Sequence, residues 1–267
     1  MSNLTEAAKK LFQEKGIDLV IGYVKGRPDR AKAAFFTNAD IKQELIFDQS
    51  CTQNLITYIH KPEVKKYGKT AIVVNDAAIR AFLQLAAENQ IKHEKYVLLK
   101  QEPDGTVLLF ENYKDIEEYI KDKPGVLPPY AKEKLDQIRN LENKDRWNFW
   151  VQEFSSCIKC YACRAACPMC YCSKCTVESN QPQWIPPQAS TQGNLEWHLL
   201  RAMHMAGRCI SCGECTKACP VDIPVGLLSA HLNDELYNMF GSRPGMMHDD
   251  EYALSVYKPN DKEEFIR

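Results

Sequence analysis

Short apolar runs recur through the first half of the chain, each bounded by polar residues. Between them lie stretches in which apolar residues repeat at helical spacing. Strands are predicted at residues 18–24, 33–36, 70–74, 96–99 and 107–110, and helices at about 51–60, 77–89 and 113–121. Alternating strands and helices are typical of an α/β sheet. We therefore predict an α/β domain over residues 1–123.

The chain starts with another helical pattern. Leu4, Ala8 and Leu11 repeat along one helix face, and Gly16 supplies a stop. A folded amphipathic helix is expected here, and not a signal peptide.

Proline and glycine interrupt regular structure after residue 123, at Pro124, Gly125, Pro128 and Pro129. We place the domain boundary there and assign residues 124–156 to a linker and a lead-in helix. Helical spacing at residues 195–205 and 225–236 predicts an α-helical module over 157–241. The remaining residues, 242–267, are polar and acidic, so we expect a solvated C-terminal tail.

The composition is that of a folded chain long enough for two domains, with 267 residues, 45% apolar and 26% charged. Basic and acidic residues are interleaved and the formal net charge is -1, so no nucleic-acid partner is expected. No apolar run approaches the roughly 20 residues of a membrane span. All cysteines except Cys51 lie in the second half, which is typical of metal ligation in a reducing, cytoplasmic setting.

Eight of these cysteines form two copies of one motif, Cys-x2-Cys-x2-Cys-x3-Cys-Pro. Three cysteines at this spacing can hold one 4Fe-4S cluster, and in two-cluster ferredoxins the fourth cysteine ligates the other cluster. We therefore predict two 4Fe-4S clusters with exchanged fourth ligands. The first set is Cys157, Cys160, Cys163 and Cys219, and the second set is Cys209, Cys212, Cys215 and Cys167.

Zinc sites also use Cys-x2-Cys pairs, but a tetrahedral zinc site has no use for a third evenly spaced cysteine. A zinc-bearing structural adaptor is therefore the weaker interpretation. Trp147 and Trp150 precede the first motif, and they either cover a cluster or belong to an ordinary core.

Three further cysteines, Cys170, Cys172 and Cys175, follow the first motif directly. They could belong to a third metal centre, completed by Cys51, His198 or His204. One of them could instead replace Cys167 as a ligand of the second cluster. In the third interpretation they are buried thiols that pack as small apolar groups, as we expect for Cys51.

Five parts of the chain carry a family resemblance: residues 18–23, 47–55, 80–91 and 257–266, and the cysteine motifs. Together they resemble the beta-subunit family of the deazaflavin-reducing hydrogenase and formate dehydrogenase, in its form with a dicluster ferredoxin module. The resemblance implies a cytoplasmic subunit of an anaerobic redox assembly. Its implied partners are a formate dehydrogenase, a hydrogenase or a heterodisulfide-reductase-like flavoprotein.

One segment departs from that family. The family usually has Lys-Gly-Cys-Asp-Ser-Arg where this chain has Asn75-Asp76-Ala77-Ala78-Ile79-Arg80, so the thiol and the carboxylate are replaced by alanines. We hypothesise that the α/β domain is a docking scaffold. The alternative is a flavin-containing subunit, with bound FAD, that reduces a deazaflavin or a similar soluble acceptor.

The function expected from these patterns is electron transfer through the two clusters between partner subunits. Such a relay needs no acid, base or nucleophile, so we predict no catalytic residue.

Overall fold

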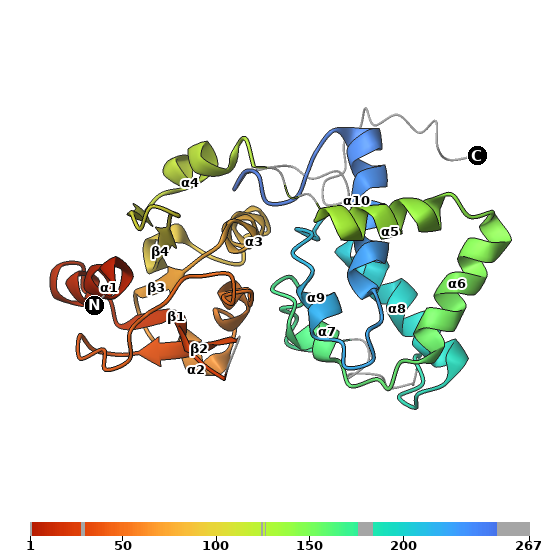
Figure 1. Cartoon of the computed structure of the whole chain (residues 1–267), viewed down its shortest axis with the longest axis horizontal. Helices are drawn as coiled ribbons and strands as arrows, with labels where there is room; N and C mark the ends of the chain where they lie inside the picture. The colour runs from red at the N-terminus through yellow and green to blue at the C-terminus, as the bar shows by residue number, and fades with distance from the viewer. Residues whose placement is uncertain (1, 28–29, 124, 126, 176–183, 250–267) are drawn as a thin grey trace.

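The structure is a computed structural model that describes residues 2–27, 30–123, 125, 127–175 and 184–249. An α/β region and a helical region lie side by side (Figure 1). All five predicted strands are present, as β1 (Leu19–Lys25), β2 (Ala31–Phe36), β3 (Thr70–Val73), β4 (Tyr96–Gln101) and β5 (Val107–Phe110). They form one sheet in the order β2-β1-β3-β4-β5, in which the three central strands are parallel and the edge strands antiparallel.

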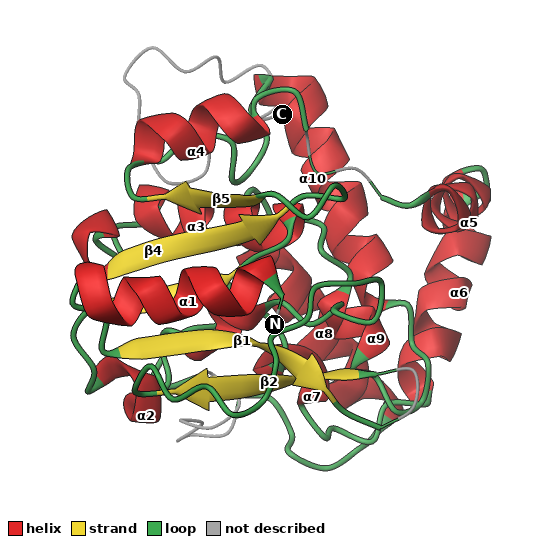
Figure 2. Ribbon diagram, turned by 60° about the vertical axis from the view of Figure 1, so that its left-hand side comes forward, coloured by secondary structure: helices red, strands yellow, loops and turns green. Residues whose placement is uncertain are grey.

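Helices cover both faces of this sheet. The predicted first helix is α1 (Asn3–Glu14), which lies on one face, and α3 (Asp76–Ala87) lies on the other (Figure 2). Burial on both faces explains why β1 and β3 are continuous apolar runs. The side chain of Asn75 accepts a hydrogen bond from Ala78 N at 2.8 Å and so caps α3. After β5, α4 (Tyr113–Ile120) completes the α/β region.

The helix predicted at residues 51–60 is wrong. The structure has a single 3-10 turn there, η1 (Leu55–Tyr58), followed by the short α2 (Pro62–Lys65). Its apolar residues Leu55, Ile56 and Ile59 are nevertheless buried. The apolar spacing therefore indicated which residues contact the core. A 3-10 turn can bury the same residues as a helix. A second short 3-10 turn, η2 (His93–Lys95), precedes β4.

The single lead-in helix is also wrong. Two helices, α5 (Pro129–Arg139) and α6 (Asn143–Ser155), meet at a turn and run in different directions (Figure 1). Arg146 stabilises the turn by donating to the carbonyl of Arg139 at 3.0 Å. On α6, Trp150 is buried and stacks on Phe154 in the helical core, whereas the side chain of Trp147 is 50% exposed.

The regular elements described after α6 are all helical: α7 (Ala162–Ala165), α8 (Thr191–Met205), α9 (Glu214–Lys217) and α10 (Val225–Phe240). α8 begins at Ser190, whose side chain accepts from Gly193 N, and α10 ends at Gly241 with a φ of 73°. No helix among the described residues is long and apolar enough to cross a membrane.

A buried carboxylate joins the two regions. Glu88, at the end of α3, accepts two hydrogen bonds from Arg208 at 2.9 and 2.6 Å and one from the Tyr171 hydroxyl at 2.7 Å. The Glu88 side chain is only 3% exposed. Since a buried charge is costly unless it is paired, this cluster holds the regions in one relative orientation.

The segment after α10 returns to the α/β region. Gly245 N donates to the Gln84 side chain on α3 at 2.9 Å, and His248 contacts Glu117 on α4. Residues 242–249 are therefore packed where a solvated tail was predicted, while residues 250–267, with the 257–266 segment of the resemblance, lie outside the described residues.

Candidate metal centre

The two cysteine motifs have the same backbone shape. In the first, Lys159 and Tyr161 have φ angles of 52° and 57°, and in the second, Ser211 and Gly213 have φ angles of 56° and 75°. These left-handed residues stand at equivalent positions, and each motif then enters a one-turn helix, α7 or α9. The two short helices contact each other. The repeat in sequence is therefore a repeat in structure, with its two copies packed together.

The left-handed turns point backbone amides at sulfur atoms. Lys159 N donates to the Cys157 sulfur at 3.3 Å, and the amide of Ser211 makes the corresponding interaction with Cys209. Hydrogen bonds to ligating sulfurs are one of the ways in which a protein sets the potential of an iron-sulfur cluster. Both loops are thus shaped to hold thiolates.

Each fourth cysteine lies beside the opposite motif. Cys219 packs in the same apolar cluster as Cys157 and Cys163 of the first motif, and Cys167 lines one cavity with Cys209, Cys212 and Cys215 of the second. Burial raises the pKa of Cys209 to about 12, with contributions from Cys215 and Cys167. Cys219 is therefore close to the first motif and Cys167 close to the second.

The two sets differ in exposure. Each set has one buried cysteine, Cys163 or Cys215, but Cys160 of the first set is exposed and no cysteine of the second set is. Cys167, Cys209 and Cys212 of the second set also pack on the core of the α/β region. A cavity of about 550 Å³ is lined by all four cysteines of the second set, together with apolar side chains such as Met205 and Leu227. The second set is therefore the interior one.

The donor set fits iron-sulfur clusters. The four thiols of the second set line one cavity, a backbone amide points at a sulfur in each motif, and burial raises the pKa of Cys163 to about 11, so that this thiol carries its proton. Metal ligation replaces such protons, so binding is expected to release them.

The three additional cysteines have separate environments. The thiol of Cys170 is hydrogen-bonded to Cys167, which lowers the pKa of Cys167 and raises that of Cys170. Cys172 is exposed and Cys175 is partly exposed. Of the residues suggested to complete a third centre, Cys51 bonds within its own loop to Ile46 and Asp48.

The two suggested histidines also lie apart from one another. His198 stacks on Phe154 with ring centroids 4.3 Å apart, and His204 is exposed. A third metal centre therefore stays a prediction.

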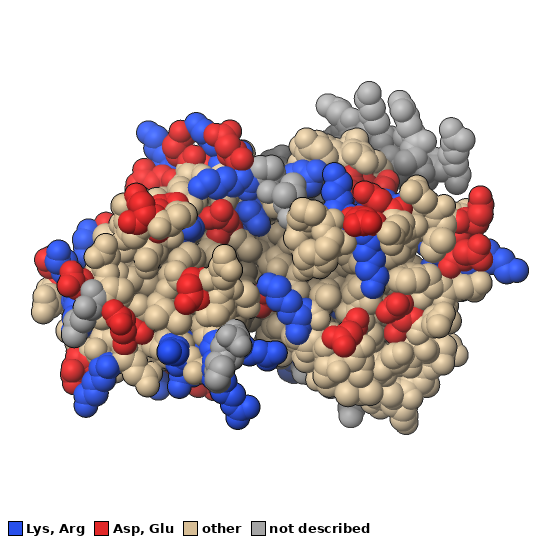
Figure 3. Space-filling model, in the orientation of Figure 1, with Lys and Arg blue, Asp and Glu red and all other residues tan. Residues whose placement is uncertain are grey.

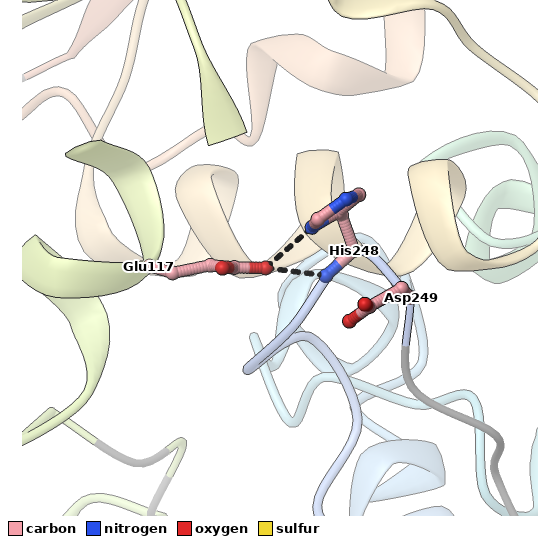
Figure 4. A group of neighbouring side chains, drawn as sticks. All are labelled: Glu117, His248 and Asp249. Atoms are coloured by element: carbon pink, nitrogen blue, oxygen red, sulfur yellow. Dashed lines mark hydrogen bonds and ion pairs between the residues drawn. The ribbon is translucent and has the colours of Figure 1, made fainter. Parts of the chain in front are cut away.

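One other group of possible ligands lies within the described ranges, formed by Glu117, His248 and Asp249 (Figure 4). Their ligand atoms lie within 4.8 Å of one another. Glu117 already accepts from His248 N at 2.8 Å and contacts its Nδ1 at 2.6 Å. Because the protein itself occupies this carboxylate, the group fastens the segment after α10 to α4.

Sequence reasoning missed a buried polar face on α8. Asn194, His198 and Arg201 are all less than 5% exposed, and they follow one another at helical spacing between the two motifs. Asn194 donates to the carbonyls of Phe154 and Cys157 at 3.1 and 2.8 Å and so ties α8 to the first motif. The sequence did contain a signal for this face. The three polar residues repeat at helical spacing in a segment that also carries buried apolar residues.

Arg80 is the residue of the 75–80 segment that matches the family pattern, and it faces the helical region. It is buried, it donates to the carbonyl of Lys123 at 3.0 Å, and its Nε lies beside Gly125, which also borders the carbonyl of Ile210 in the second motif. Burial lowers its pKa. The α/β region therefore contributes a cation beside the second set.

Comparison with known proteins places the helical region in a class. Residues 153–223 match the family model described as a 4Fe-4S dicluster domain. This part of the chain is thus an iron-sulfur, electron-transfer module, and the predicted 4Fe-4S chemistry of the cysteine motifs is confirmed.

Two curated relatives are similar to the chain, one over a longer stretch and the other at higher identity. The chain is 34% identical over 100 residues to the F420-dependent formate dehydrogenase subunit beta of Methanocaldococcus jannaschii, a match that covers 36% of this chain and 25% of the relative. It is 28% identical over 198 residues to the F420-dependent formate dehydrogenase 1 subunit beta of Methanococcus maripaludis, covering 69% of this chain and 45% of that protein. The resemblance to the beta-subunit family is confirmed, and the matches span less than half of these relatives' lengths.

Proposed function

We propose that the chain is an electron-transfer subunit of a cytoplasmic, anaerobic redox complex, and that it relays electrons through two 4Fe-4S clusters. The observation that carries the proposal is the doubled cysteine motif, whose fourth cysteines pack beside the opposite motif. Each cluster accepts and donates single electrons, and the exchanged ligands keep the two clusters close enough for electrons to pass between them. The ligands are the first and second sets as defined above.

In this proposal residues 157–241 form an α-helical ferredoxin-like unit. The exposed side of the first set, at Cys160, meets one redox partner, while the second set faces the α/β region. Residues 1–123 act as the docking scaffold, since Glu88 at the end of α3 pairs with Arg208 of the helical region. The names of the relatives support a formate dehydrogenase as one partner. A hydrogenase or a heterodisulfide-reductase-like flavoprotein is the other.

The test is analysis of the full chain, prepared without oxygen, for iron, inorganic sulfide and flavin, with electron paramagnetic resonance of the reduced protein. About eight irons and eight sulfides are expected for two cubane clusters. Absence of inorganic sulfide, or a zinc-loaded colourless protein, would overturn the proposal. Bound FAD would favour the alternative function, reduction of a deazaflavin or a similar acceptor. A surplus of iron would implicate Cys170, Cys172 and Cys175.

Cys212→Ala is the matched variant. It is expected to lose the second cluster and about half of the iron, and to stop electron flow in the assembled complex, because a cubane needs its thiolates. Cys51→Ala is the control, since Cys51 bonds only within its own loop among the described contacts. Undiminished electron flow in Cys212→Ala would contradict the relay.

A further inference from the structure

A buried arginine stands between the two cysteine sets. Arg201 on α8 is 4% exposed, and its Nη2 donates to the carbonyl of Cys163, in the first set, at 3.2 Å. The same side chain lines the cavity of about 550 Å³ together with the four cysteines of the second set. Arg201 therefore contacts the first motif and faces the site of the second.

Within the described ranges, Arg201 hydrogen-bonds only to neutral groups, the Cys163 carbonyl and the Cys170 thiol. No carboxylate there forms an ion pair with it, and its Nε is buried without a hydrogen-bond acceptor. An unpaired buried guanidinium is strongly unfavourable, because burial removes the water that solvates its charge. The free Nε–H thus points to an anion that occupies the cavity.

The thiolates that would hold the clusters would supply that negative charge. The carbonyl of Cys163 of the first set accepts a hydrogen bond from Arg201, and Cys167 and Cys215 of the second set line the same cavity as Arg201. These residues come from both sets. The guanidinium accordingly lies within electrostatic reach of both.

We propose that Arg201 is the shared counter-cation of the two clusters and that it raises the reduction potential of each. The inference rests on the proposed iron-sulfur function. On reduction, each cluster gains one electron and one negative charge, while Arg201 keeps its proton and no bond in the protein forms or breaks. A fixed positive charge in a poorly solvated site stabilises the reduced cluster more than the oxidised one.

The experiment is a redox titration of the full chain without oxygen, followed by electron paramagnetic resonance. In Arg201→Gln, both midpoint potentials are expected to become more negative by at least about 59 mV, a tenfold change in the equilibrium constant of a one-electron couple. Arg201→Lys keeps the positive charge, so its two midpoint potentials are expected to stay closer to those of the wild-type protein. Lys217→Gln is the control, because Lys217 belongs to the second motif but its side chain is 49% exposed. There, solvent screening is expected to keep the shift small.

Unchanged potentials in an iron-complete Arg201→Gln protein would overturn the inference, as would a shift in one cluster alone. If Arg201→Gln fails to hold iron, the midpoint potentials of Arg201→Lys test the inference instead. Two clusters at near wild-type potentials in the lysine variant support the shared charge, and their loss overturns it. Wild-type protein without clusters would instead refute the proposed function, so the two failures are distinguishable.

Discussion

The α/β region and the helical region solve the problem of stability in different ways. The α/β region buries a large apolar core around its central strands. In the described part of the helical region, the separate core has ten buried residues, of which two are the cysteines Cys163 and Cys215. Buried polar side chains such as Lys159, Asn194 and Arg201 also surround it. From this comparison we expect the helical region to depend on its metal centres for folding, whereas apolar packing holds the α/β region together.

Removing the clusters is the most direct way to break this comparison. After iron and sulfide are stripped, we expect the helical region to lose several kcal/mol of stability, because binding energy of a structural metal site is folding energy. The α/β region keeps its fold. Hydrogen exchange would show lost protection in α7, α8 and α9 and retained protection in β1, β3 and β4. Equal protection of α8 with and without metal would contradict the comparison.

The contact at Glu88 tests how strongly the two regions depend on each other. Glu88→Gln removes the negative charge with which Arg208 pairs, and removing one charge of a buried pair costs about 3–5 kcal/mol. Denaturant unfolding of the full chain measures the loss. Glu118→Gln is the control, because the exposed pair of Glu118 with Lys121 is worth less than about 1 kcal/mol. Similar losses of unfolding free energy in the two variants would show that the Glu88 contact stabilises the protein no more than an exposed ion pair does.

A smaller effect is expected from acid at the same interface. His60 packs on Tyr171 with ring centroids 5.2 Å apart, and burial, followed by Lys65, lowers its pKa from 6.5 to about 4. Between these values the unfolded chain binds more protons than the folded one. The contribution of neutral His60 to the free energy of unfolding is therefore fully present above pH 6.5. It is lost as the pH falls toward 4, and the loss is on the order of 1–3 kcal/mol.

His60→Phe, which keeps a ring against Tyr171, should lose less stability than wild type between pH 7 and 5. Chemical unfolding at several pH values measures the difference. The exposed His204→Gln is the control and should follow wild type. A His60→Phe protein with the full acid sensitivity would remove His60 from the explanation.

Some features could be predicted because they depend on neighbours in the chain. The strands were found since continuous apolar runs such as 70–74 suit a sheet covered on both faces. The cysteine motifs were found because cluster ligation demands a fixed spacing. The helix at 51–60 and the unbroken lead-in helix were wrong, because apolar spacing reports burial and does not distinguish a helix from a 3-10 turn or two helices from one.

The sequence by itself determined the sheet-forming runs, the two cysteine motifs and the class of metal that they suit. Each of these features depends on the spacing of residues that are close together in the chain. Only the tertiary structure decided that Arg201 faces both motifs, that the second set is the interior one, and that Glu88 joins the two regions. These contacts connect residues far apart in the chain. Their energies come from burial and from charge in a poorly solvated interior, and both exist only after the chain has folded.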